Sequence, residues 1–145
     1  MSKEIKICFV CMGNTCRSIM AERLLKFFLK QNKINSLKVL SKGLCANGEN
    51  IAENAKQVLK EYGALSKDRK SVRLKKIEQD VLYIAMTENI KSQINGKVIC
   101  VRDLIGEEID DPFMKDISAY RKTAQQIVKA NKVLIDKILN LRGEK

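Results

Sequence analysis

The sequence contains no histidine and no tryptophan, and it has a single proline among 145 residues. Without histidine, nucleophile–histidine catalysis and the usual histidine-containing zinc sites are excluded, so any nucleophile must be activated by dipoles, hydrogen bonds and cations. Long apolar runs are also missing, because no stretch reaches transmembrane length. Lys3 and Lys6 interrupt the first apolar segment, which is therefore unlike a signal peptide. We expect a cytoplasmic protein with no membrane partner.

The five cysteines are an odd number, and in a reducing compartment we expect thiols rather than a disulfide framework. Hydrophobic residues make up 45% of the chain and charged residues 31%, which is ordinary for a globular protein. A chain of 145 residues can build a proper core. We expect one domain spanning residues 1–145.

The charge balance is strongly basic. Lysine and arginine total 28 against 17 acidic residues, a net charge of +11, so anions are steered toward the surface. The basic residues are spread along the chain, with a modest concentration at 67–76, and no basic tract is interleaved with aromatics as in single-strand binders. A basic surface that suits a phosphorylated protein substrate is therefore favoured over nucleic-acid binding.

The most informative stretch runs from Cys11 to Ser18, with the sequence Cys-Met-Gly-Asn-Thr-Cys-Arg-Ser. It follows the apolar run 5–10, a predicted buried strand, and precedes an amphipathic helix that Ser18 would cap and that would end near Asn32. The backbone N–H groups of such a loop can surround an anion beside the positive end of the helix. Arg17 can grip two phosphate oxygens with its planar fork. Cys11 would then direct its sulfur at phosphorus, as a nucleophile.

The rest of the chain alternates strand and helix patterns, which predicts an α/β fold: a three-layer, four-stranded parallel sheet with helices on both faces. In such sheets ligands bind beyond the carboxyl ends of the strands, so we expect the loop holding Asp111 to meet the Cys11 loop. The further strands are predicted at 37–40, 81–86 and 97–101, the helices at 49–62, 87–94 and 117–141, a turn with a short helix at 65–76 and a loop at 104–116.

At these residues the chain resembles a known family. Residues 10–18, followed by Met20-Ala21-Glu22, are similar to the signature of the low-molecular-weight protein-tyrosine-phosphatases, and Asp111-Pro112-Phe113 to that family's second motif. The segments 41–43 and 85–87 also sit where family members carry similar sequences. The resemblance spans essentially the whole chain. It implies a phosphorylated protein as substrate, inorganic phosphate as product, and no metal or other cofactor.

The mechanism expected from these residues is covalent. Cys11 would attack phosphorus as a thiolate, favoured by the loop amides, the helix dipole and Arg17. Arg17 and the amides would hold the equatorial oxygens, and Asp111 would protonate the leaving group and later deprotonate water. By resemblance, Ser18 donates a hydrogen bond to the thiolate and Asn14 braces the loop. The predicted phosphate-binding loop comprises Met12, Gly13, Asn14, Thr15, Cys16, Arg17 and Ser18.

Each role has a structural alternative. Cys11 could be a buried thiol, Arg17 a surface residue, and Asp111 a turn former, with Asp110 as the acid instead. Cys16 is either a small packing residue or, by resemblance, a redox-protective partner that forms a disulfide with Cys11. The remaining thiols are expected to be inert: Cys8, Cys45 and Cys100.

Other function classes fit less well. Cys8 and Cys11 form a C-x-x-C, but Cys8 lies within a predicted strand, unlike thioredoxin sites, and a metal cluster with Cys16 lacks a fourth ligand. A thiol-dependent arsenate reductase needs a downstream cysteine pair, whereas Cys45 and Cys100 are far apart in sequence. A non-catalytic phosphoprotein-binding module would need neither Cys11 nor an acid.

The choice between phosphotyrosine and phosphoarginine as substrate depends on Thr15. By resemblance, tyrosine phosphatases carry a bulky aliphatic residue at this position, while arginine phosphatases carry threonine. A hydroxyl can accept a hydrogen bond from guanidinium, although Thr15 could also merely fill space. Phe113 suits either class as an apolar wall. We expect a monomer that prefers phosphoarginine and also hydrolyses aryl phosphates.

Overall fold

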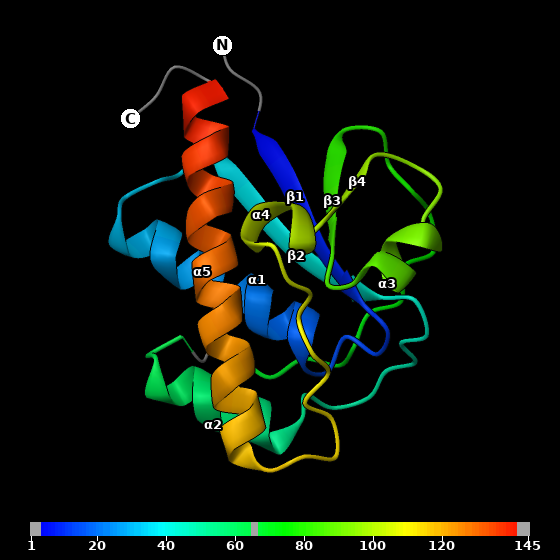
Figure 1. The fold of residues 1–145 in the computed structure, drawn as a ribbon, viewed down its shortest axis with the longest axis vertical. Helices are drawn as coiled ribbons and strands as arrows, with labels where there is room; N and C mark the ends of the chain where they lie inside the picture. The colour runs from blue at the N-terminus through cyan, green and yellow to red at the C-terminus, as the bar shows by residue number, and fades with distance from the viewer. Residues whose placement is uncertain (1–3, 65–66, 142–145) are drawn as a thin grey trace.

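The computed structural model describes residues 4–64 and 67–141, and Figure 1 shows the course of the chain. Within these ranges β1 to β4 and α1 to α5 follow one another as β1 (Ile5–Cys11), α1 (Arg17–Gln31), β2 (Leu37–Gly43), α2 (Glu53–Glu61), β3 (Val81–Ala85), α3 (Glu88–Ser92), β4 (Val98–Cys100), α4 (Arg102–Ile105) and α5 (Ile117–Leu141). None of the helices in this part of the chain is long and apolar enough to cross a bilayer.

The sheet is parallel throughout, with strand order β2-β1-β3-β4. The chain passes from β1 to its neighbour on one side, and then returns to place β3 on the other side. This reversal makes the carboxyl end of β1 a switch point, where α/β sheets open a crevice for ligands. The predicted parallel α/β fold is thus confirmed, and the Cys11–Ser18 loop leaves β1 at the crevice.

Some element boundaries differ from those expected from the sequence. Strand β2 continues to Gly43, because Ser41 to Gly43 stay paired with the last residues of β1. Helix α2 begins only at Glu53, and the short helix α4 occupies the start of the predicted loop at 104–116. Residues 67–76 form no helix, so the short helix predicted there is wrong for these residues, while 65 and 66 lie outside the described ranges.

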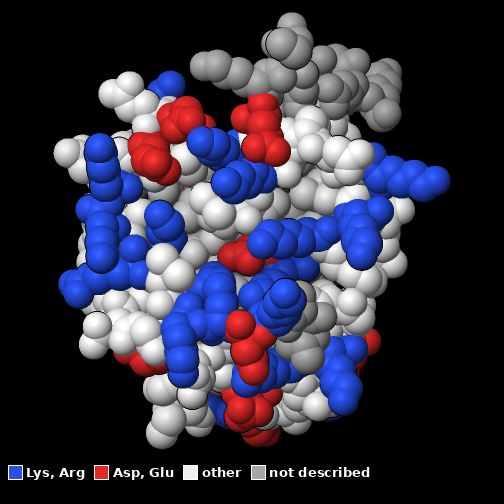
Figure 2. Space-filling model, turned by 180° about the vertical axis from the view of Figure 1, so that it is seen from behind, with Lys and Arg blue, Asp and Glu red and all other residues white. Residues whose placement is uncertain are grey.

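Positive charge covers much of the surface, as the composition indicates. Figure 2 shows Lys and Arg side chains over much of the rear face, with smaller groups of Asp and Glu between them.

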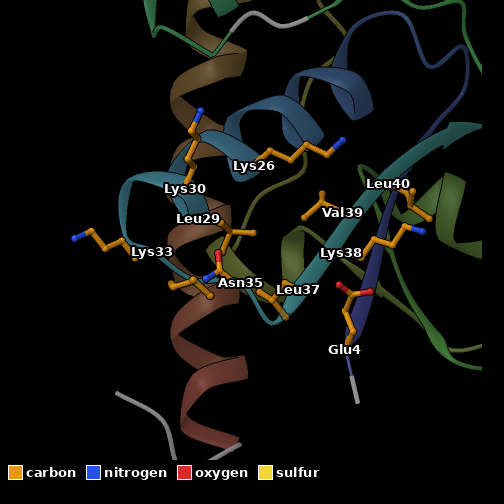
Figure 3. Close-up of a pocket in the computed structure, with 11 residues that line it drawn as sticks. Glu4, Lys26, Leu29, Lys30, Lys33, Asn35, Leu37, Lys38, Val39 and Leu40 are labelled. Carbon is orange, nitrogen blue, oxygen red and sulfur yellow. The ribbon is translucent and has the colours of Figure 1, made fainter. Parts of the chain in front are cut away.

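Strand β2 lies at one edge of the sheet. Beside it, α1 and β2 border a hollow of about 860 Å³ that Lys26, Lys30, Lys33 and Lys38 line with Glu4, and the lysine side chains spread outward around it (Figure 3). Lysine on an exposed edge opposes pairing with the strands of another molecule. Lys38, the exposed lysine of β2 itself, is placed to oppose such pairing.

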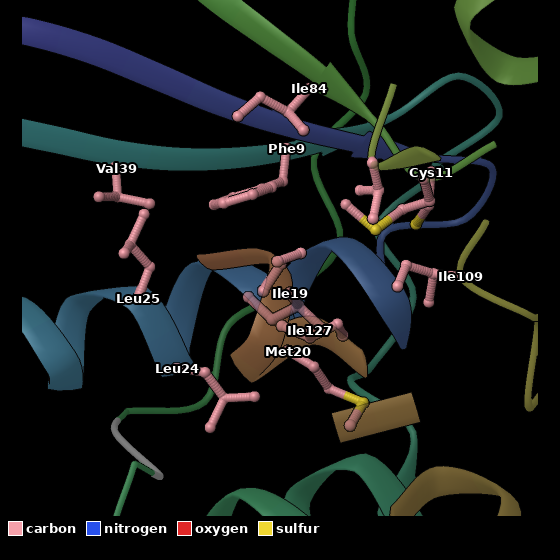
Figure 4. Close-up of a cluster of buried hydrophobic side chains, with 14 of the residues drawn as sticks. Phe9, Cys11, Ile19, Met20, Leu24, Leu25, Val39, Ile84, Ile109 and Ile127 are labelled. Atoms are coloured by element: carbon pink, nitrogen blue, oxygen red, sulfur yellow. The ribbon is translucent and has the colours of Figure 1, made fainter. Parts of the chain in front are cut away.

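The core joins the sheet to α1. Phe9, Val39 and Ile84 from three neighbouring strands point toward Ile19 and Leu25 of α1 (Figure 4), and all five are nearly inaccessible to solvent. Helix α5 packs against α1, α2 and α4, while α3 packs against β3 and β4. The start of α1 is thereby fixed against the end of β1.

Candidate active site

Cys11 ends β1 with its side chain almost fully buried, at 3% exposure. Its Sγ lies 2.9 Å from Ser18 Oγ and accepts a hydrogen bond from the Asn14 backbone N–H at 3.2 Å. The Asn14 N–H is a donor to the sulfur, and the Ser18 hydroxyl can be a second one, since its oxygen already accepts from Asn14 Nδ2. Ser18 is not the helix cap that we predicted: Cys16 holds that position without a side-chain bond, and Ser18 lies in the first turn, facing the sulfur.

Arg17 and Asp111 meet across the site, as the strand-end argument predicts. The Arg17 guanidinium is buried, with its side chain 7% exposed, and one nitrogen lies 3.6 Å from Asp111 Oδ2. Another nitrogen donates to the Ile109 carbonyl at 3.3 Å, which fixes the plane of the fork. Asp111 Oδ1 accepts from the Phe113 backbone N–H at 3.0 Å, so the turn directs the other oxygen toward Arg17.

These groups border one cavity of about 370 Å³. Of the two candidate acids, only Asp111 lines it, whereas the backbone carbonyl of Asp110 accepts a hydrogen bond from Thr123 Oγ1 at 3.4 Å. The cavity lining includes Cys11, Phe113 and the segment at 49–52, which sequence analysis did not assign to the site. The lining residues are Cys11, Met12, Gly13, Thr15, Cys16, Arg17, Glu49, Asn50, Ala52, Asp111 and Phe113.

Asn14 is the structural centre of the loop. It is fully buried and has a positive φ of 57°, a conformation that asparagine tolerates better than most residues. Its Nδ2 donates to Ser18 Oγ at 2.8 Å and to Ser41 Oγ at 2.9 Å. Its Oδ1 accepts from Arg69 at 3.0 Å and from the Val72 N–H at 2.9 Å. All polar atoms of the side chain amide are therefore used to hold the loop.

A buried carboxylate extends this network away from the sulfur. Glu22 Oε1 accepts from Ser41 Oγ at 2.7 Å and from Arg69 at 3.0 Å, while Oε2 accepts from Lys26 at 2.9 Å. Burial opposes ionisation of Glu22, but the hydrogen bonds from Ser41 and Lys26 and the charges of Lys26 and Arg69 outweigh it and lower the pKa. Arg69 was missed from the sequence, because it is one of several basic residues in a segment without periodicity.

Gly43 gives β2 its close approach to the loop. A Cβ at this position would lie 2.7 Å from Met12 O, 2.8 Å from Asn14 N and 2.9 Å from Gly13 C. These distances are shorter than van der Waals contact, so only glycine fits without moving the loop. The backbone is held here as well, because Leu44 N–H donates to Cys11 O at 3.0 Å.

The other thiols differ in environment. Burial raises the pKa of Cys8 to about 12, and burial also raises the pKa of Cys100 and of Cys16. Cys16 Sγ lies 3.5 Å from Tyr120 Oη, a contact with a residue that sequence analysis did not single out. Among residues 4–64 and 67–141, His, Cys, Asp and Glu form no group of three that could hold a metal ion.

This arrangement suits group transfer to sulfur. The cavity has a thiol at its floor, a buried guanidinium beside it, backbone N–H groups around the loop and a carboxyl group opposite. An anion with three equatorial oxygens fits such a set of donors, and the carboxyl group can exchange a proton with the departing atom.

Comparisons with known proteins agree with the geometry. A sequence profile described as "Low molecular weight phosphotyrosine protein phosphatase" matches residues 6–142. The chain is 33% identical over 134 residues to the low molecular weight protein-tyrosine-phosphatase PtpB of Staphylococcus haemolyticus, covering 86% of this chain and 93% of that one. It is also 33% identical over 146 residues to the protein-arginine-phosphatase of Geobacillus stearothermophilus, covering 92% and 93%.

A solved structure gives the same result. A mutant of the arginine phosphatase YwlE, whose active-site serine is phosphorylated, superposes with a TM-score of 0.79 at 26% identity, over 92% of this chain and 95% of the other. The residues matched by the family profile, 6–142, include the Cys11–Ser18 loop and Asp111. The chain belongs to the low-molecular-weight phosphotyrosine protein phosphatase family.

Proposed function

We propose that this chain is a cytoplasmic, monomeric, single-domain phosphatase that removes phosphoryl groups from proteins, with phosphoarginine preferred. The observation that carries the catalytic assignment is that Cys11, Arg17 and Asp111 line one cavity, with Arg17 and Asp111 3.6 Å apart. The names of its relatives support a protein phosphatase and do not favour an arsenate reductase or a non-catalytic binding module.

The reaction proceeds in two displacements. In the first, the Cys11 thiolate forms an S–P bond as the bond from phosphorus to the leaving atom breaks, and the protonated Asp111 carboxyl group gives its proton to that atom. Arg17 and the loop N–H groups hold the three equatorial oxygens. In the second, water attacks phosphorus, Asp111 takes its proton, and the S–P bond breaks to release inorganic phosphate. The phosphorylated serine in the YwlE mutant supports the covalent route.

The preference for phosphoarginine rests on Thr15, which lines the cavity. Its Oγ1 makes a hydrogen bond with Cys16 Sγ at 3.8 Å, and a hydroxyl oxygen has two acceptor lone pairs, so it can still accept from a substrate. A guanidinium leaving group carries N–H groups that can donate hydrogen bonds to this oxygen. A phenol leaving group has no N–H donor next to its bridging oxygen. The name of the Geobacillus relative is consistent with this branch.

Phosphotyrosine is the second candidate substrate. Phe113 lines the cavity with its side chain still 57% exposed, and such a free aromatic face can stack on a phenol ring. Aryl phosphates are therefore expected to be hydrolysed as well, at lower efficiency.

The deciding experiment measures phosphate release from two peptides of identical sequence, one with phosphoarginine and one with phosphotyrosine. The native protein should favour phosphoarginine, and Thr15→Ile should reverse the preference, because the aliphatic side chain removes an acceptor and adds apolar surface. Preference of the native protein for phosphotyrosine would contradict the role of Thr15.

The control for the chemistry is Cys11→Ser. This variant should bind inorganic phosphate through the unchanged Arg17 and loop amides, yet turn over neither peptide. Turnover by the serine variant at the native rate would rule out a covalent step on Cys11.

A further inference from the structure

A further cavity, of about 770 Å³, is lined in part by Asn47 and Gly48, next in sequence to Glu49 and Asn50 of the active-site cavity. Four cationic side chains line it, Lys42, Arg73, Lys75 and Lys76, against one acidic residue, Glu78. Lys42 is half-buried and the other three are exposed. Within the described part of the chain none of the four makes an ion pair, in contrast to Lys56 and Arg121, whose partners are present. We call these four residues the basic basin.

The basic basin and the active site share one wall. Asn47 and Gly48 line the basin, while the next two residues, Glu49 and Asn50, line the catalytic cavity. Ser71 of the basin fixes this wall, because its hydroxyl donates to Glu49 Oε1 at 2.6 Å and accepts from the Glu49 N–H at 2.8 Å. The two cavities are therefore separated by a single, hydrogen-bonded turn.

The backbone gives the separation between nucleophile and basin. Gly43 pairs with Cys11 on one side and bridges Arg73 on the other. Two strand spacings of about 4.8 Å place the backbones of Cys11 and Arg73 about 10 Å apart. An extended peptide covers that distance in about three residues. A substrate chain with its phosphorylated residue over Cys11 can thus bring a side chain about three residues away to the basin.

We propose that the basic basin binds acidic side chains of the protein substrate, about three or more residues from the phosphorylated one, and so selects acidic sequence contexts. This specificity rests on the phosphatase function proposed above. The four cationic side chains outnumber the single acidic one, so the net positive charge of the basin complements carboxylates of a substrate. Bases of a nucleic acid would need aromatic surfaces to stack on, and the lining of the basin holds no aromatic residue.

The kinetic test uses three phosphopeptides with the same central residue: one with neutral flanks, one with glutamates on the amino side and one with glutamates on the carboxyl side. At low salt, kcat/KM for at least one acidic peptide should exceed that of the neutral peptide by about fivefold, the effect of roughly two exposed charge pairs. The advantage should fade at high salt, because exposed charges are screened.

The test variant reverses three exposed charges, in Arg73→Glu/Lys75→Glu/Lys76→Glu. The matched control makes the same charge change on α5, in Lys129→Glu/Lys132→Glu/Lys137→Glu. We expect the basin variant to lose the preference for acidic flanks and to keep its rate on p-nitrophenyl phosphate, which is too small to reach the basin. The α5 control should keep both.

A binding measurement makes the inference independent of turnover. A fluorescent, unphosphorylated glutamate-rich peptide should bind the native protein and the α5 control, and should bind the basin variant several-fold more weakly. Equal rates on all three phosphopeptides, equal losses in the two variants, or displacement of the peptide by a tighter-binding single-stranded RNA would each overturn the proposal. A native protein that binds the peptide but hydrolyses no phosphoester would refute the phosphatase function without contradicting the binding of acidic side chains by the basin.

Discussion

At the scale of single residues, the proposed acid Asp111 and the proposed phosphate-binding residue Arg17 form an ion pair with each other, at 3.6 Å. Arg17 is held by burial and by the Ile109 carbonyl, while Asp111 stands half exposed at 53% on the opposite wall. Arg17 is thus fixed and Asp111 is the partner that can turn. When a phosphoryl group binds the Arg17 guanidinium in place of Asp111, the Asp111 carboxyl group is released and can face the leaving atom.

Replacing Asp111 by asparagine tests whether this side chain gives a proton to the leaving group. Asp111→Asn keeps the size of the side chain and its bond to the Phe113 N–H, but it removes the transferable proton. For phosphates with poor leaving groups kcat/KM, which reports the first displacement, should fall by about a hundredfold or more. For p-nitrophenyl phosphate, whose leaving group needs little protonation, the fall should be small.

The measurement is kcat/KM across a series of aryl phosphates, plotted against the basicity of the phenol. The variant should show the steeper dependence. Parallel lines for native protein and variant would mean that Asp111 gives no proton to the leaving group.

At the scale of elements, the end of β2 shapes the catalytic loop. Gly43 presses its backbone against Met12, Gly13 and Asn14, and the same glycine donates its N–H to Val72 O at 2.9 Å. The loop is therefore packed between its own helix and the neighbouring strand, and its curvature depends on a strand that supplies no reacting group.

Gly43→Ala should consequently damage catalysis more than folding. The added methyl group has to displace the loop, and a misplacement of about 1 Å can reduce a rate by about a hundredfold. The readouts are kcat/KM on p-nitrophenyl phosphate and the thermal unfolding midpoint. Lys38→Ala, an exposed position on the same strand, is the control and should leave both values unchanged. A Gly43→Ala protein with native activity would show that the loop is not shaped by this contact.

At the scale of the whole molecule, Glu22 couples the active site to global stability. Its pKa is lowered in the folded protein, against the effect of burial, by Ser41, Lys26 and Arg69. A lowered pKa means that the ionised group stabilises the fold above its unfolded value of about 4.3 and that this stabilisation is lost as the pH falls through the folded value.

Glu22→Gln should therefore reduce the free energy of unfolding by about 3 kcal/mol at neutral pH, because Arg69 loses its buried partner. The difference from the native protein should begin to shrink below the unfolded pKa and vanish below the lowered pKa of the folded protein, where both proteins carry a neutral side chain. Urea unfolding at a series of pH values measures it. Asp136→Asn on the exposed side of α5 is the control, with little effect expected. If the loss in free energy of unfolding caused by Glu22→Gln stays constant as the pH falls, the charge of Glu22 is not the source of the stabilisation.

Sequence patterns predicted the parts of this molecule that depend on local order. The Cys11–Ser18 loop is contiguous, and Asp111 could be placed near it because the carboxyl ends of parallel strands share one edge of the sheet. The network around Asn14 could not be predicted. Arg69 and Ser41 reach Asn14 across 55 and 27 residues, and residues 67–76 have no periodic pattern that fixes their position. Ser18 was misplaced as a cap because its hydroxyl serves the sulfur instead.

The segment 67–76 has two sides that can change independently. Its inner side, Arg69 and Ser71, is anchored to buried partners of the loop and its wall, whereas Arg73, Lys75 and Lys76 point outward. Under the proposed role of the basic basin, substitutions on the outer side change which protein substrates bind, while the anchored inner side keeps the catalytic loop in place. Over evolutionary time, or in directed evolution, such a segment allows new specificities to be tried without loss of the catalyst.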